Sequence, residues 1–112
     1  MNSELRQAFN AEMKTSMDLY EKGELAKAFQ HLEVAHVLGQ QYIAPHVRTH
    51  YWMLKIGLKR RSLQEIWGQL IRIGLGAMGS AVGIVPVGNT GGTNMSMFKR
   101  LPVDPNIQKL IN

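Results

Sequence analysis

Apolar residues recur at helical spacing through most of this chain, and glycines interrupt the pattern at regular points. The first apolar run stops at Gly23, which predicts a helix over about residues 3–22. The second run stops at Gly39, so a second helix is expected to follow Gly23 and to end near residue 38. The two runs are joined by very few residues, which favours an antiparallel hairpin.

A second pair of helices follows the same logic. Pro45 fits the first turn of a helix that reaches about residue 61. Ser62 and Glu65 then stand three apart before another apolar run, the capping-box arrangement typical of a helix start, so a fourth helix should begin near Leu63. Glycines later in this helix each cost about 1 kcal/mol relative to alanine, but they would let a neighbouring helix approach closely.

From residue 86 onward turn residues replace the periodic pattern, until Asp104 and Pro105 offer a start for a last short helix. We therefore expect one all-α domain over 1–112: a small helical bundle of two antiparallel hairpins over 1–85, with a glycine-rich irregular tail over 86–112 that wraps it. A faint internal echo at an offset of 34 residues is similar to a tetratricopeptide-like hairpin.

The composition excludes several classes of function. The chain has no cysteine, which excludes disulfides, thiolate metal sites and cysteine nucleophiles. Charged residues near the amino terminus argue against a signal peptide, and the uncharged stretch 73–88 is too short for a membrane span, so a cytoplasmic location is expected. The net charge is +5, but the basic run ends a predicted helix, which favours a solvated helix end over a nucleic-acid footprint. That run is Lys55, Lys59, Arg60 and Arg61.

All four histidines fall within residues 31–50. At about 100° per residue, His36 lies on the apolar stripe of the second helix, with Glu33 about 60° to one side of it. His31 projects about 140° away from His36, so the two cannot share a site on a regular helix. His31 is therefore expected to stand outside any site that His36 forms.

Two further helices present polar residues toward the expected core. His46 and His50 are separated by four residues and project about 40° apart on the third helix, whereas Arg48 points the other way. On the first helix, Glu12 projects among the apolar residues of the stripe, and a buried carboxylate needs a charged partner, hydrogen bonds or a cation. Three helices thus offer ligand-capable side chains to one interior.

These residue types favour a transition-metal site within a helical bundle. Imidazole and carboxylate ligands on facing helices suit zinc, iron or manganese. Glu33-x-x-His36 has the spacing of ferritin-like dinuclear sites, but the other segments of that pattern are missing. The simplest hypothesis is a single ion held by His36, His46 and His50 with either Glu12 or Glu33.

In that hypothesis His31 and Arg48 are placed around the ligand set and not in it. The sequence does not choose between a catalytic site at an open coordination position and a site that stores, senses or buffers the metal. Without a metal, Glu12 and His36 would form a buried hydrogen-bonded pair, and His46 and His50 would lie half-exposed at a hairpin edge.

A different class of function also fits. The chain would then be a helical-hairpin interaction module that binds a protein partner or a second copy of itself through its basic helix end and glycine-rich tail. The segment GNTGG, residues 88–92, has the small residues of an anion-binding nest, but no Lys-Ser or Lys-Thr follows, so a turn is the better interpretation.

The segments AFQHLEVAHVLGQQYIAPHVRTHYWMLKIGLKRR and VPVGNTGGTNMSMFKR resemble a family of small bacterial proteins catalogued as a domain of unknown function. The resemblance covers nearly the whole chain. It implies a small stand-alone bacterial protein, and it implies no activity, cofactor or ligand. The functional hypotheses therefore depend on the directions of the histidines and glutamates.

Overall fold

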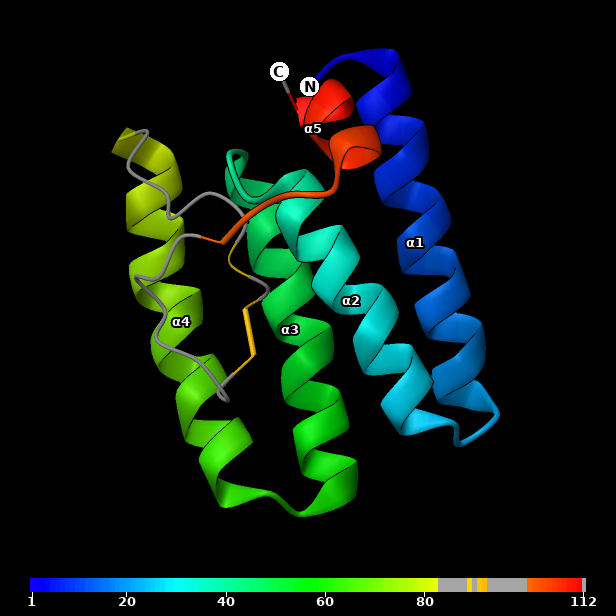
Figure 1. Ribbon diagram of the computed structural model, residues 1–112. Helices are drawn as coiled ribbons and strands as arrows, with labels where there is room; N and C mark the ends of the chain where they lie inside the picture. The colour runs from blue at the N-terminus through cyan, green and yellow to red at the C-terminus, as the bar shows by residue number, and fades with distance from the viewer. Residues whose placement is uncertain (83–88, 90, 93–100, 112) are drawn as a thin grey trace.

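The computed structural model describes residues 1–82, 89, 91–92 and 101–111, and all regular secondary structure in these residues is helical (Figure 1). This confirms the all-α class, and the helices begin and end within two residues of the predicted positions. The five helices are α1 (Ser3–Glu21), α2 (Leu25–Gly39), α3 (Ile43–Arg60), α4 (Leu63–Val82) and α5 (Pro105–Ile111).

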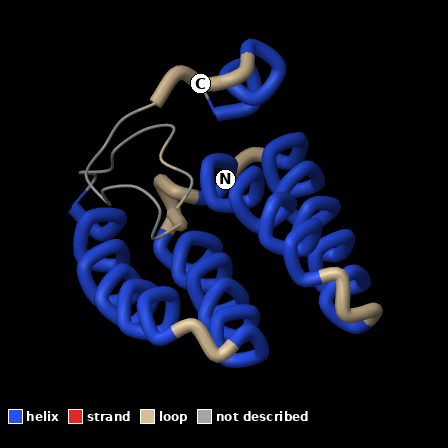
Figure 2. Tube along the Cα trace, turned by 60° about the horizontal axis from the view of Figure 1, so that its bottom comes forward, coloured by secondary structure: helices blue, strands red, loops and turns tan. Residues whose placement is uncertain are grey.

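The first four helices form two antiparallel hairpins, as expected. Helix α1 packs against α2, and helix α3 packs against α4. The two hairpins meet through contacts between α2 and α3. The helices therefore lie in a row in chain order, which both views show (Figures 1 and 2). Helix α5 contacts α1 and α2. No helix in the described residues is both long enough and apolar enough to cross a membrane.

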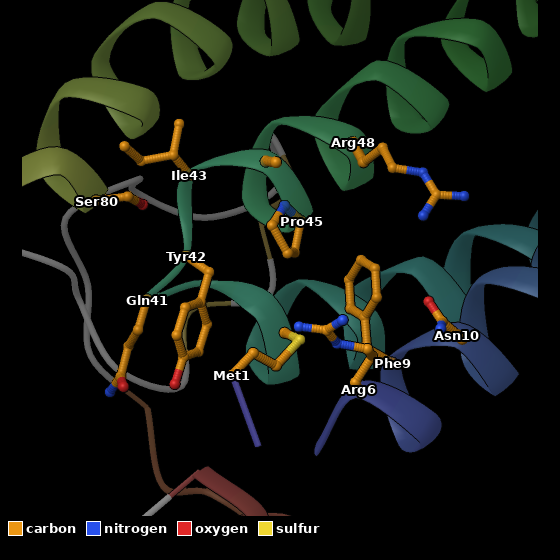
Figure 3. Close-up of a pocket in the computed structure, with 11 residues that line it drawn as sticks. Met1, Arg6, Phe9, Asn10, Gln41, Tyr42, Ile43, Pro45, Arg48 and Ser80 are labelled. Atoms are coloured by element: carbon orange, nitrogen blue, oxygen red, sulfur yellow. The ribbon is translucent and has the colours of Figure 1, made fainter. Parts of the chain in front are cut away.

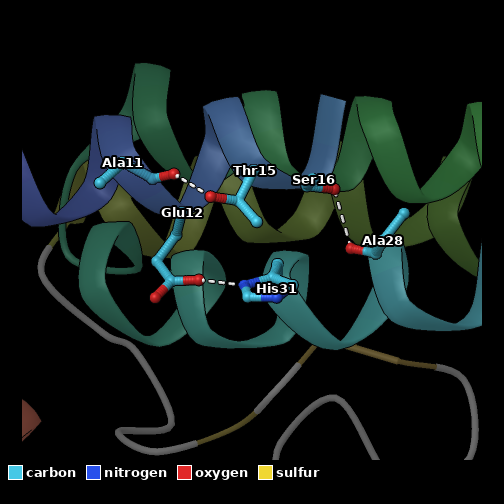
Figure 4. Close-up of polar contacts among 6 residues, drawn as sticks. All are labelled: Ala11, Glu12, Thr15, Ser16, Ala28 and His31. Atoms are coloured by element: carbon cyan, nitrogen blue, oxygen red, sulfur yellow. Dashed lines mark hydrogen bonds and ion pairs between the residues drawn. The ribbon is translucent and has the colours of Figure 1, made fainter. Parts of the chain in front are cut away.

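The core of the α1–α2 hairpin is apolar, with one polar crossing point. Leu5, Phe9 and Met13 of α1 are buried, as is Leu32 of α2. Between them the Ser16 hydroxyl donates to the carbonyl oxygen of Ala28 at 2.8 Å, which satisfies a buried polar group at the helix contact (Figure 4). Close packing of this hairpin fixes where α2 directs its remaining side chains.

Two lysines of the basic run at the end of α3 lie over aromatic rings. The Lys55 ammonium lies 4.1 Å from the centre of the Trp52 ring, and the Lys59 ammonium lies 4.1 Å from the centre of the Tyr20 ring. Tyr20 and Trp52 also meet edge to face at 5.4 Å between ring centres. Lys59 and Trp52 of α3 therefore contact Tyr20 near the end of α1.

Helix α4 has its polar and small residues toward α3 and its apolar residues toward the outside. Gln69 is fully buried and Ser80 nearly so, whereas Trp67 is 65% exposed and Met78 is 67% exposed. The helix continues through its glycines to Val82. A side chain at Gly76 would meet the His46 ring at 2.9 Å, so the expected close approach of helices is found there.

Most of the predicted tail lies outside the described residues, namely 86–88, 90, 93–100 and 112, so its wrapping path and the division of the domain stay predictions. The short last helix is confirmed. Its start is capped by Asp104, whose carboxylate oxygen accepts a hydrogen bond from the Asn106 N–H at 2.8 Å. Of the described residues beyond α4, Asn89 bonds to His36 through its carbonyl oxygen, and Gly91 lies against the His36 ring.

Candidate metal centre

Three buried histidines converge on one point between α2, α3 and α4. The Nε2 atom of His36 lies 3.0 Å from the Nε2 atom of His46 and 3.0 Å from that of His50. The rings are only 2–4% exposed. Their potential ligand atoms all lie within 4.8 Å of one another, which makes this group a candidate metal site.

The spacing of these atoms is compatible with one shared ion. Two nitrogens held about 2.0–2.1 Å from a single ion are about 3.3 Å apart at a tetrahedral angle and about 2.9 Å apart at a right angle. The observed 3.0 Å separations fall between these two geometries. An ion could therefore bind with only small movements of the rings.

The other nitrogen of His36 is committed to a backbone carbonyl. His36 Nδ1 lies 2.6 Å from the carbonyl oxygen of Asn89. A carbonyl oxygen only accepts, so Nδ1 must carry the proton and donate it. Asn89 is itself held in place because its side-chain oxygen accepts from the Gly91 N–H at 2.9 Å.

The Nδ1 atom of His46 is also protonated, because its hydrogen-bond partner is a serine hydroxyl that can only accept. Its Nδ1 lies 2.7 Å from the Ser80 hydroxyl oxygen. That hydroxyl donates its only proton to the carbonyl oxygen of Gln40 at 2.8 Å, so it is left to accept from the histidine. His46 therefore also carries its proton on Nδ1.

His50 is oriented by a glutamine whose amide has a fixed direction. Gln69 Nε2 donates to the carbonyl oxygen of Gly91 at 3.0 Å and to the Glu65 carboxylate at 2.6 Å. This turns Gln69 Oε1 toward His50 Nδ1, at 2.5 Å. An amide oxygen only accepts, so the third histidine too is protonated on Nδ1.

A neutral histidine ring has one N–H group. Since the three hydrogen bonds hold the proton on Nδ1, each neutral ring has an unprotonated Nε2 atom that faces the other two rings. Burial lowers the pKa of His46 and of His50 from the ordinary value of 6.5 to about 4, although the hydrogen bond with Gln69 opposes the change at His50. Burial lowers the pKa of His36 well below 6.5, reinforced by the charges that His50, His46 and Arg72 would add. All three rings are thus neutral near pH 7.

Neutral rings in this arrangement cannot hydrogen-bond to one another. Each Nε2 atom offers a lone pair and no proton, so contacts of 3.0 Å bring together acceptors only. A metal ion at the centre could accept all three lone pairs. The outer bonds are those expected of metal-binding histidines, which usually donate their other ring N–H to a carbonyl or carboxylate oxygen or to water.

Two glycines make room for the convergent rings. A side chain at Gly91 would meet His36 Cδ2 at 2.7 Å and His36 Nε2 at 3.0 Å. A side chain at Gly76 would come within 3.2 Å of His46 Nε2. The histidine rings can therefore lie this close to the backbone only because neither residue has a side chain.

The first glutamate predicted as a ligand lies elsewhere. Glu12 was expected inside the apolar stripe of α1, but Met13 occupies that place and Glu12 lies at its edge, where its side chain is 29% exposed. Its carboxylate lies 2.7 Å from Nδ1 of His31 (Figure 4). The expectation that Glu12 is a buried residue is therefore wrong, and the alternative pair of Glu12 with His36 is not formed.

The remaining candidates, His31, Glu33 and Arg48, lie outside the convergent group. His31 stays apart from the other histidines, as the helix geometry predicts. Glu33 is partly buried on α2 and does not belong to the convergent group, and Arg48 is exposed on α3. The alternative in which His46 and His50 are half-exposed is wrong, because both rings are buried.

The residues that hold the rings were not predicted from the sequence. Gln69 and Ser80 lie eleven residues apart on one face of α4, which is the signal that could have identified them. Asn89 lies in GNTGG, and its backbone carbonyl, which carries no residue-type signal, is the group that binds His36. Backbone acceptors of this kind are visible only after folding.

Comparison with known families supports the resemblance seen in the sequence. Residues 3–111 match the family described as "Protein of unknown function (DUF3703)". The chain belongs to this family. No curated protein and no solved structure matches the chain.

The low pKa values predict how the metal-free protein responds to acid. An unfolded histidine takes up its proton near pH 6.5, whereas folded His46 and His50 resist protonation until about pH 4. Between these values the unfolded chain binds more protons, so the free energy of unfolding should fall as the pH falls, by up to about 1.4 kcal/mol per pH unit for each histidine.

Urea unfolding in the presence of a chelator, measured between about pH 7 and pH 5, tests this expectation. The doubly substituted protein H46Q/H50Q should show a shallower dependence on pH over the same range. A stability that stays constant or rises as the wild-type protein is acidified would contradict neutral, buried rings.

Proposed function

We propose that this protein binds one divalent transition-metal ion through the Nε2 atoms of His36, His46 and His50. The observation that supports the proposal is the tautomer of each ring. Three acceptor groups hold the protons on Nδ1, so three lone pairs meet at one buried point with no proton between them. A polar network that only stabilises the fold would pair donors with acceptors.

The ligand set favours zinc among the ions considered. Three neutral imidazoles form a nitrogen-only set that suits zinc and other late first-row metals, whereas manganese prefers oxygen ligands. Neither Glu12 nor Glu33 belongs to the convergent group. Iron, which commonly adds a carboxylate to two histidines, therefore ranks below zinc.

A site with three protein ligands differs from a structural zinc site. Structural sites are closed by four protein ligands, whereas three histidines leave a fourth position for water or another small ligand. Zinc held in this way lowers the pKa of a bound water to about 7. The proposed role is therefore reversible metal binding with one exchangeable position, suited to metal handling or to chemistry on a metal-bound water.

Arg72 is a positive charge near the site, and the Glu65 carboxylate is a negative charge that lies behind His50. Burial lowers the pKa of Arg72, while the charge of Glu65 acts in the opposite direction. The Glu65 carboxylate accepts from Gln69, which in turn accepts from His50. This chain places a negative charge behind His50, and such a partner raises the basicity of a metal-binding imidazole.

Removing one ligand should abolish tight binding. The purified chain without a tag should bind one equivalent of zinc in a calorimetric titration, and His50→Ala should weaken binding by more than the 10- to 100-fold that loss of an outer partner typically causes. His31→Ala is the matched control, because His31 bonds to Glu12 and lies outside the group; it should bind zinc like the wild type.

Thermal unfolding provides a second measurement that does not depend on the variants. Zinc at about 100 times its dissociation constant should stabilise the wild type by about 2.7 kcal/mol. The proposal fails if the wild type gains no stability from zinc, iron or manganese, or if His31→Ala and His50→Ala bind zinc equally well.

The role of the outer partners can be tested at Gln69. Gln69→Leu removes the acceptor for His50 Nδ1 and should weaken zinc binding about 10- to 100-fold. Glu65→Gln leaves the Gln69 acceptor in place and retains an oxygen that can accept from Gln69 Nε2, so it should weaken zinc binding less than Gln69→Leu does. Equal affinities for both variants in the same titration would show that the proton on His50 Nδ1 is not held by this bond.

A further inference from the structure

A pocket of about 600 Å³ lies between the first half of α1 and the connection from α2 to α3 (Figure 3). This volume is within the range of small-molecule sites. Tyr42, Ile43 and Pro45 supply apolar surface, and Arg6 and Arg48 bring two positive charges from distant parts of the chain. The pocket is separate from the point where the histidine Nε2 atoms converge.

The apolar floor is built in advance of any ligand. Phe9 is only 2% exposed. A side chain at Gly39 would meet both the Phe9 ring and the Pro45 ring at 2.8 Å, so the end of α2 is pressed against these two residues. Interlocked packing of this kind keeps the floor in one conformation, which lowers the entropic cost of binding.

The two arginines have no opposite charge beside them. No aspartate or glutamate of the described residues lines the pocket. Neither Arg6 nor Arg48 forms an ion pair with a described residue. Figure 3 shows the Arg6 guanidinium beside Phe9, directed toward Tyr42, while Arg48 lies on the other side of the Phe9 ring with its guanidinium pointing away from Arg6. Guanidinium groups bind carboxylate and phosphate oxygens in pairs.

We infer that this pocket binds a small organic anion, with a carboxylate or phosphate group on Arg6, an apolar body on Tyr42 and Pro45, and Arg48 as a second positive charge at the rim. The net charge of +5 favours the approach of such a ligand. The wall of the pocket includes Ser80, whose hydroxyl accepts from His46 Nδ1. The proposed ligand would thus lie beside the metal centre, although its binding does not depend on a metal.

Amide NMR spectra of the full chain, titrated with phenylphosphonate or benzoate as anionic probes and benzyl alcohol as an uncharged one, test the inference. Both anions should cause saturable shifts at Phe9 and Tyr42, and the stronger of the two would identify the preferred acidic group. Arg6→Gln should raise the dissociation constant about tenfold, as expected for loss of a charge-assisted hydrogen bond, and Arg48→Gln, which removes a charge at the rim, should raise it less.

Arg60→Gln is the matched control, because it removes the same charge from an exposed position at the end of α3, outside the pocket. It should change the dissociation constant less than twofold. The inference is overturned if neither anion causes saturable shifts at millimolar concentration, if all three variants weaken binding equally, or if benzyl alcohol binds as tightly as the anions. The comparison of probes on the wild type decides the matter even if a variant does not fold.

Discussion

The protons on the Nδ1 atoms of three histidines are the constraint on which the site depends. Each proton is held by an oxygen that can only accept a hydrogen bond. The oxygens of Asn89 and Gln69 are carbonyl oxygens, and the Ser80 hydroxyl has already donated its proton to the carbonyl oxygen of Gln40. Burial keeps the rings neutral, so the remaining nitrogens have lone pairs and nothing to share. His36 Nε2 lies 3.0 Å from each of the other two Nε2 atoms, so the group could hold a cation, and the tautomers that create it are set by residues outside the group.

This requirement also explains the unusual surface of α4. A helix that packs on a neighbour usually buries its apolar stripe, yet α4 turns Gln69 and Ser80 inward and leaves Trp67 exposed. The inward face must supply acceptors to two histidines and must leave space for their rings, which Gly76 provides. The site thus receives polar groups from α4, while the apolar core comes mainly from α1 and α2, with Met53 and Ile56 of α3.

The sequence predicted the helices well because helix starts and stops are local signals. Gly23, Gly39 and the Ser62–Glu65 pair mark boundaries that the structure places within two residues of expectation. Helix geometry also separated His31 from the other three histidines. It failed for Glu12, since a residue at the edge of a stripe can face either way, and the neighbouring His31 decides the direction. The Asn89 carbonyl could not be predicted, because any residue has one and only the folded chain brings it to His36.

The most direct test of this account is a ring-nitrogen NMR spectrum of the histidines in the presence of one equivalent of zinc. The account predicts three rings, those of His36, His46 and His50, each with a protonated Nδ1 and a metal-bound Nε2, and a His31 ring that zinc leaves unchanged. A spectrum in which zinc binds through Nδ1, reaches fewer than these three rings or alters only His31 would contradict it.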